Sequence, residues 1–313
     1  MMLIYDICYR VFFWLKRMRK RFPGLEKISR EYEYYFSLLL NRKFIPWFEK
    51  HPVKWGLNKK KRDERYTVSL TSFPARIEYV HIAIETLMRQ SFQPDNIVLW
   101  LAESQFPERK LPESLVKLES KGLIIRFCED LKSHKKYFYV FQEYPDDNII
   151  LADDDIFYPM DTIQKLVRLH KKYPKDILGV SAQIVAPTLS ALPSVWLTPS
   201  MEERYIRCDC AQVFTGAGSL FPAGWYPDEI RNCDKAMKIA GTADDLWLKA
   251  MSLLAGVKTT IVYPQRGFPV AIYIPDNQTL FSMNGNQGEN MNDKVWKVLV
   301  EEYGLDRMSE ESR

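Results

Sequence analysis

One stretch constrains this chain more than any other, an apolar run that ends in three consecutive carboxylates. Residues 149–152 are Ile-Ile-Leu-Ala, and Asp153, Asp154 and Asp155 follow directly. A short apolar run of this kind is typical of a buried strand. Because open α/β sheets bind ligands at the carboxyl ends of their strands, the three acids are predicted to lie at a ligand-binding edge.

The three acids indicate a metal site. Carboxylate oxygens suit Mg²⁺ or Mn²⁺, and such an ion completes its shell with water and substrate phosphates. Three adjacent like charges are costly unless a cation neutralises them. The alternative is that the acids only cap the next helix, where Asp is favoured. We expect a divalent metal, with a nucleotide diphosphate as the accompanying ligand.

Predicted strands and helices alternate through the middle of the chain. This pattern indicates βαβ units and a mainly parallel sheet, and therefore an α/β fold. The predicted strands are 66–71, 96–101, 122–127 and 177–185, and the predicted helices are 77–91, 134–144 and 161–172. We expect one domain over 63–275, a basic helical appendage over 1–62 and a C-terminal helical segment over 276–313.

The N-terminal appendage contains a basic amphipathic helix. At 100° per residue one stripe is apolar and another is basic. The apolar stripe consists of Ile4, Cys8, Val11, Leu15, Met18 and Phe22. Residues 1–24 are therefore predicted to lie in the interface of an anionic membrane, the alternative being a core helix that docks on the domain. The first fifteen residues, interrupted by Asp6 and Arg10, match neither a signal peptide nor a spanning helix.

Charge and cysteine usage limit the partners and the compartment. The net charge of +4 is modest and its excess lies near the N-terminus, so we expect no nucleic-acid partner. Five cysteines form no framework spacing, which favours a reducing compartment. Cys208 and Cys210 are predicted to be ordinary thiols. We expect a cytoplasmic protein, peripheral on the cytoplasmic face of a membrane.

Basic residues near the acidic strand are candidates for binding phosphate. Lys135 and Lys136 precede that strand by one helix, and Arg76 follows the first strand. A cation in a crevice at the sheet edge would neutralise a diphosphate. A solvated basic turn is the alternative for the lysines, and an ordinary surface arginine is the alternative for Arg76.

Two later segments have the composition of a transferase site. The first, 214–221, contains Gly216 and Gly218 where a backbone needs close approach to a ligand, although small residues also serve tight packing. The second contains Asp244 and Asp245 in the first turn of a helix that Thr242 is predicted to cap. One of these acids could act as a general base, or both could be helix-dipole partners.

Together these stretches resemble nucleotide-sugar glycosyltransferases of the GT-A fold, a Rossmann-like arrangement, in particular family 2. The resemblance covers about residues 66–265. Residues 68–76 look like the family's first strand and nucleotide-binding loop, and 85–92 look like the end of its first helix. Asp153 and Asp155 have the spacing of the metal-binding DxD motif, and Asp244-Asp245 stands in for the "ED" pair. A second similarity is to the transferase domain of exostosin-like proteins.

The resemblance implies a role for each candidate residue. Asp153 and Asp155 would hold Mn²⁺ or Mg²⁺, and Asp245, with Asp244 beside it, would be the catalytic base. The predicted donor side consists of Thr71, Ser72, Arg76, Lys135, Lys136, Asp153 and Asp154. The predicted acceptor side consists of Gly216, Ala217, Gly218 and Trp247.

The resulting hypothesis is a metal-dependent hexosyltransferase of cell-surface polysaccharide synthesis. It would move a sugar from a nucleotide diphosphate, most simply a UDP-sugar, to a hydroxyl of a glycan or lipid-linked glycan. Residues 186–210 and 284–292 are candidates for acceptor selection. Two alternatives stay open: a sugar-phosphate nucleotidyltransferase, and a non-catalytic membrane-associated partner with a degenerate transferase fold.

Overall fold

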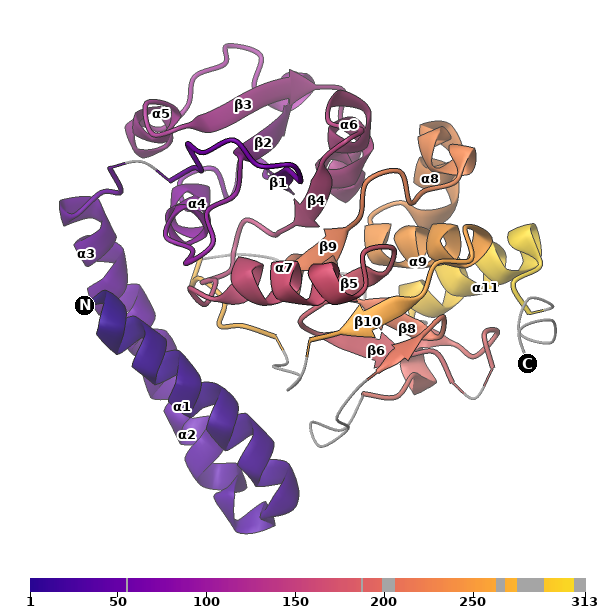
Figure 1. Ribbon diagram of the computed structural model, residues 1–313, viewed down its shortest axis with the longest axis horizontal. Helices are drawn as coiled ribbons and strands as arrows, with labels where there is room; N and C mark the ends of the chain where they lie inside the picture. Colours follow the sequence, from indigo (N-terminus) through magenta and orange to yellow (C-terminus); the bar gives the residue numbers. More distant parts are fainter. Residues whose placement is uncertain (55, 187, 199–205, 263–267, 275–289, 307–313) are drawn as a thin grey trace.

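The protein consists of an α/β body and a helical hairpin that projects from it (Figure 1). The computed structural model describes residues 1–54, 56–186, 188–198, 206–262, 268–274 and 290–306. The predicted α/β class with a mainly parallel sheet flanked by helices is confirmed. Part of the predicted acceptor segments, 199–205 and 284–289, lies outside the described residues, as do most of the residues between the body and the last helix.

The central sheet has the strand order β3-β2-β1-β4-β9-β5-β10-β7. β1 is parallel to both β2 and β4, β2 is parallel to β3, and β5 is parallel to β10, whereas β9 and β7 run antiparallel to their neighbours. The strands are β1 (Tyr66–Thr71), β2 (Asn96–Ala102), β3 (Leu123–Cys128), β4 (Asn148–Leu151), β5 (Ile177–Gly179), β7 (Arg207–Cys208), β9 (Ser219–Phe221) and β10 (Thr259–Ile261). A separate pair consists of β6 (Ala182–Ile184) and β8 (Ala211–Val213).

Strand side chains alternate between two cores, one on each face of the sheet. In β4, Ile149 and Leu151 enter one core, whereas Ile150 enters the other. Apolar residues on both faces explain why these strands appear as continuous apolar runs. One predicted strand was wrong in extent, because 177–185 is divided into β5 and β6, which belong to different sheets.

Helices cover both faces of the sheet. One core contains residues of α6 (Lys135–Glu143), α8 (Cys233–Ala240), α9 (Asp244–Leu254) and α11 (Met291–Tyr303). The other contains residues of α4 (Val80–Met88), α5 (Glu113–Glu119) and α7 (Thr162–Lys172). Short 3-10 helices occur at Glu103–Gln105, Lys132–His134, Pro193–Val195, Thr215–Ala217 and Asp228–Arg231.

The N-terminal appendage forms a third core. It consists of α1 (Met2–Arg21), a 3-10 turn (Pro23–Leu25), α2 (Glu26–Leu39), a π-helical turn (Leu40–Phe44) and α3 (Ile45–Lys50). Aromatic side chains from α1 and α2 pack together and onto Ile82, Phe157 and Val270 of the body. The buried residues of α1 are Tyr5, Tyr9, Phe12, Phe13 and Leu15, so Leu15 of the predicted apolar stripe is inside. No helix in the described parts of the chain is long and apolar enough to cross a membrane.

Chain direction changes between β1 and β4. From β1 the chain proceeds outward through β2 and β3, and it then returns to place β4 on the other side of β1. Ser69 pairs with Leu151 across these strands, so both carboxyl ends reach the same edge. Ligands of open α/β sheets bind at such a switch point. The acidic run after β4 begins here.

Candidate functional site

The loop after β1 holds the middle acid of the run. The Ser72 hydroxyl donates to Oδ2 of Asp154 at 2.6 Å, and Arg76 Nη1 donates to Oδ1 at 2.7 Å. Arg76 also lies 2.9 Å from Oδ2 of Asp155. The Asp154 side chain is only 6% exposed. Burial raises the pKa of Asp154 and Arg76 opposes that rise, so this pair fixes the loop after β1 against the loop after β4.

The outer acids of the run are more accessible. The Asp153 side chain is 35% exposed and that of Asp155 is 17% exposed. Burial and the neighbouring Asp154 carboxylate raise the pKa of Asp155 to about 7. A bound cation would relieve this repulsion, because a nearby positive charge favours the ionised form.

Lys136 connects this acidic run to the second acid pair. It lies at the start of α6, and its Nζ donates to Asp153 Oδ1 at 2.8 Å and lies 3.0 Å from Oδ2 of Asp244. Burial lowers the pKa of Lys136, but Asp153 and Asp244 outweigh that effect and raise it, so the lysine stays charged. The buried ammonium therefore joins residues that are about ninety positions apart in the sequence.

Gly216 allows the chain before β9 to approach the acidic run. β9 is antiparallel to β4 with Leu151 opposite Ser219, which places 216–218 beside Asp153. A Cβ on Gly216 would lie 1.8 Å from Asp153 Oδ2, so no other residue fits without displacing that carboxylate. The Tyr158 hydroxyl ties the two segments, accepting from Asp153 N at 2.7 Å and donating to Gly216 O at 2.6 Å.

The second acid pair begins α9, and its two members have different surroundings. Asp244 is buried, and although burial raises its pKa, Lys136 outweighs that effect and lowers it. Asp245 accepts from the backbone N–H of Thr215 at 3.2 Å and from the Thr215 hydroxyl. Desolvation and the Asp244 carboxylate raise the pKa of Asp245 to about 7. A carboxylate with such a pKa suits general-base chemistry near neutral pH.

The charges of this cluster do not balance. Five carboxylates, of Asp153, Asp154, Asp155, Asp244 and Asp245, interact with the cations Arg76 and Lys136. Burial lowers the pKa of nearby His134 to about 4, so it adds no charge at neutral pH. The excess of negative charge and the hard oxygen donors fit a divalent cation at Asp153 and Asp155. In the described residues no group of three or more His, Cys, Asp or Glu side chains is arranged around a metal position, so water and substrate oxygens would complete the shell.

Three predicted site residues have other partners. Lys135 Nζ lies 2.6 Å from Asp130 Oδ1, with its side chain 3% exposed. The Thr71 hydroxyl donates to the Trp100 carbonyl at 2.8 Å. Trp247 is fully buried against Tyr303 in the core. The structure therefore does not bring these side chains into the acidic cluster.

The predicted helix cap was wrong. The residue before α9 is Ala243, and no side chain caps this helix. The Thr242 carbonyl instead accepts from the Ser133 hydroxyl at 2.9 Å, which joins the segment before α9 to the segment before α6. This bond holds the acid pair next to Lys136.

Tyr158 and Thr215 belong to the site although the sequence did not single out either as a site residue. Tyr158 follows the acidic run by three positions, and Thr215 is adjacent to Gly216. A fully buried tyrosine needs a partner for its hydroxyl, but sequence alone does not reveal that the partner is the Asp153 backbone. Their nearness in sequence to the acids and the glycine was the only available signal.

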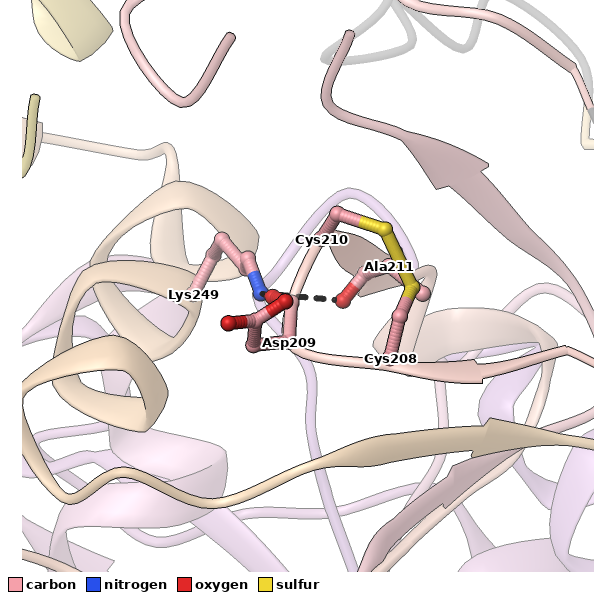
Figure 2. The surroundings of a disulfide bond; sticks show 5 residues. All are labelled: Cys208, Asp209, Cys210, Ala211 and Lys249. Carbon is pink, nitrogen blue, oxygen red and sulfur yellow. Dashed lines mark hydrogen bonds between the residues drawn. A yellow bond between two sulfur atoms is a disulfide. The ribbon is translucent and has the colours of Figure 1, made fainter. Parts of the chain in front are cut away.

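Cys208 and Cys210 are joined by a disulfide, which corrects the prediction of two ordinary thiols (Figure 2). Their Cα atoms are 5.2 Å apart, and the bridge closes the turn from β7 to β8. Lys249 of α9 donates to the Asp209 carbonyl inside this turn and to the Ala211 carbonyl at 3.1 Å. Burial lowers the pKa of Lys249 to about 7. Cys8, Cys128 and Cys233 are free.

Comparison with known proteins finds similarity only at the level of structure. No family model matches the chain, and no curated protein matches it. S. aureus TarS 1-349 in complex with UDP is similar at 12% identity and a TM-score of 0.44, with 67% of this chain and 60% of that chain covered. Glucosyl-3-phosphoglycerate synthase from Mycobacterium tuberculosis is similar at 10% identity and a TM-score of 0.44, with 81% and 88% covered.

A third solved structure is the mannosyltransferase PcManGT from Pyrobaculum calidifontis in complex with GDP-Man and Mn²⁺. It is 13% identical, with a TM-score of 0.41 and with 90% of this chain and 73% of that chain covered. All three identities are below 25% and all three TM-scores are below 0.5. The function of this chain is therefore argued from its own residues.

Proposed function

We propose that the protein is a metal-dependent glycosyltransferase that moves a sugar from a nucleotide diphosphate to a hydroxyl of a glycan or lipid-linked glycan. A UDP-sugar is the donor that we propose to test first. One observation carries the proposal: five carboxylates and two cations meet at the switch point between β1 and β4. Open α/β sheets bind ligands at that position. The excess negative charge supports a divalent cation there rather than a bare anion.

Each residue of the cluster has a proposed task. Asp153 and Asp155 would hold Mn²⁺ or Mg²⁺, which supplies positive charge to stabilise the departing diphosphate. Ser72 and Arg76 would keep the acidic run in place through Asp154, since both donate to it. Lys136 would hold Asp153 at a fixed position relative to Asp244.

Asp245 is the proposed base of an inverting transfer. It would accept the proton of the acceptor hydroxyl as that oxygen bonds to the anomeric carbon. The bond from this carbon to the diphosphate oxygen breaks, and the diphosphate leaves with the electron pair. The pKa of about 7 supports this role, because a base works best with a pKa near the operating pH.

The first test measures donor binding. Purified protein is heated with UDP, GDP, CMP or TDP, each with and without Mn²⁺. Binding to the native state raises stability by about 2.7 kcal/mol at a hundredfold excess over Kd. We expect a shift that needs both Mn²⁺ and one nucleotide and that is lost in an Asp153→Asn, Asp155→Asn variant. Asp161→Asn is the matched control, because Asp161 pairs with Lys165 on α7.

A second measurement identifies the reaction. A glycosyltransferase releases a nucleoside diphosphate from a nucleotide-sugar, whereas a nucleotidyltransferase releases pyrophosphate when it joins a nucleoside triphosphate to a sugar phosphate. Pyrophosphate release would replace the proposal with the second reaction. Absence of any nucleotide-dependent shift would leave a non-catalytic partner protein with a transferase-like fold.

A further inference from the structure

The outer face of α1 is apolar, yet its side chains are exposed in the part of the chain that the structure describes. Leu3, Ile7, Val11 and Trp14 follow one another at steps of four, four and three residues, so they form one stripe along the helix. Leu3 is 73% exposed and Trp14 is 51% exposed. We call these four residues the outer stripe. Isolated exposed apolar residues are ordinary, but a continuous stripe marks an interaction surface.

The opposite face of α1 packs against the rest of the protein. The Tyr5 hydroxyl donates to the Tyr158 carbonyl at 2.8 Å, and the Tyr9 hydroxyl donates to the Phe157 carbonyl. Both tyrosines are buried with Phe12 among the aromatic side chains of α2 and α3. The helix therefore cannot turn its aromatic face outward without breaking these bonds. The exposed apolar residues of α1 are those of the outer stripe together with Ile4.

α1 is basic and the helix beside it is acidic, and two ion pairs join them, Lys16 with Glu33 and Arg19 with Glu26. Residues 1–22 contain six basic side chains and one acidic side chain, whereas α2 contains two basic and three acidic ones. Arg10 and Arg21 are exposed next to the outer stripe, and Arg10 forms an ion pair with Asp6 one turn earlier. A second copy of the chain that docked stripe to stripe would bring two strongly basic helices together. An anionic surface is complementary to the same face.

We propose that the outer stripe of α1 is a docking surface for an anionic lipid membrane. The hairpin of α1 and α2 projects from the body (Figure 1), and all four residues of the outer stripe are exposed. Apolar side chains of a surface-lying helix enter the boundary between headgroups and acyl chains, while flanking Arg and Lys contact acidic headgroups. The proposal is independent of glycosyl transfer, and it corrects the stripe predicted from sequence, which includes the buried Leu15.

The docked helix would lie next to the acidic cluster. Tyr5 binds the carbonyl of Tyr158, and the Tyr158 hydroxyl accepts from the backbone of Asp153. A membrane on the outer stripe would therefore lie one helix thickness away from the residues that contact the acidic run.

The test is sedimentation of the full chain with phosphatidylcholine vesicles, with and without phosphatidylglycerol. We expect binding only when phosphatidylglycerol is present and a loss of binding at high salt, because salt screens the charges. The variant Ile7→Gln, Val11→Gln, Trp14→Gln should bind at least tenfold more weakly. The matched control is Ile28→Gln, Tyr34→Gln, Tyr35→Gln, which changes three exposed apolar residues of α2 and should bind as the parent does.

Circular dichroism and thermal melting of both variants establish that the hairpin is intact. Equal vesicle binding by the parent and the α1 variant would overturn the proposal, and so would equal losses in the two variants. Light scattering of the parent without vesicles tests whether a second copy of the chain binds the outer stripe instead. A dimer that the α1 variant alone dissociates, together with no vesicle binding, would assign the outer stripe to a second copy instead.

Discussion

The acidic run after β4 and the acid pair at the start of α9 both place adjacent carboxylates in a buried setting, but different residues hold them. In the run, Arg76 and Ser72 hold the middle acid, Asp154, and the flanking acids remain more accessible. In the pair, Lys136 holds Asp244, and Asp245 is left with a pKa of about 7. In both places a cation holds one carboxylate, and the pKa of the neighbouring carboxyl is raised to about 7. Adjacent acids in a site therefore need not share one function.

The largest expected effect is the loss of turnover when Asp245, the proposed base of the acid pair, is replaced. Asp245→Asn should lower turnover by about 10²–10⁴-fold, the usual contribution of a positioned base. The same variant should fold at least as stably as the parent at pH 8, because it removes a carboxylate whose ionisation is unfavourable in the folded state. Release of nucleoside diphosphate measures the first effect, and urea denaturation measures the second. Unchanged turnover would show that Asp245 is not the base.

The next effect concerns the acid that fixes the run. Arg76→Met leaves Asp154 buried without its cation, which should cost about 3–5 kcal/mol of unfolding free energy. Arg126→Met is the matched control, because Arg126 forms an exposed ion pair with Glu143 and should lose less than about 1 kcal/mol. Equal losses of unfolding free energy in the two variants, measured by chemical denaturation, would show that the buried Arg76–Asp154 pair stabilises the protein no more than an exposed ion pair.

A smaller effect should appear in the dependence of stability on pH. The pKa values of Asp155 and Asp245 are raised to about 7 in the folded state, so their protonated forms favour folding. This stability is fully present below about pH 4 and is lost as pH rises through about 7. Without metal each of the two groups loses at most about 4 kcal/mol between these limits, since one pKa unit corresponds to about 1.4 kcal/mol. The measurement is the difference between the parent and an Asp155→Asn, Asp245→Asn variant in denaturation across this range, because Asp244 and His134, whose pKa values are lowered, act in the opposite direction. The same pH dependence in both proteins would contradict both pKa directions.

The smallest effect tests the glycine that contacts the run. Gly216→Ala forces a methyl group against Asp153 and should cost about 1–3 kcal/mol, as overpacking does. It should also weaken Mn²⁺-dependent nucleotide binding in calorimetry, because Asp153 must move. Gly24→Ala, where no atom lies within 4 Å of the added carbon, is the control and should change neither quantity. A tolerated alanine at 216 would mean that Asp153 is free to shift.

Local patterns predicted the framework of the site well. Strand β1 was placed at its observed bounds, and the run 149–155 marked the carboxyl end of β4, because apolar continuity and abrupt charge are properties of neighbouring residues. The α/β class followed from the alternation of strands and helices. These signals need no knowledge of how distant segments meet.

The pairings within the site could not be predicted, because they depend on tertiary contacts. Whether Lys135 or Lys136 points to Asp153 depends on how α6 is rotated against the sheet, and sequence spacing does not determine that rotation. The pairing of Cys208 with Cys210 depends on a turn that brings their Cα atoms to 5.2 Å. On α1 the periodicity showed an apolar helix, but both sides are apolar, so it did not show which side is buried.

The hydroxyls of Tyr5 and Tyr9 determine how much of the chain must be made before α1 can dock on the body. Their partners lie 153 and 148 positions later in the chain, and Val270, also bound to Tyr9, lies 261 positions later. At roughly 5–20 residues per second, the first helix leaves the ribosome about ten seconds or more before it can dock. During that interval only α2, α3 and the turn between them are available to cover its aromatic face, and its outer stripe is uncovered. α1 is thus made well before the residues that complete its burial, and a lipid surface that covers its outer stripe in the meantime would protect the nascent chain from aggregation.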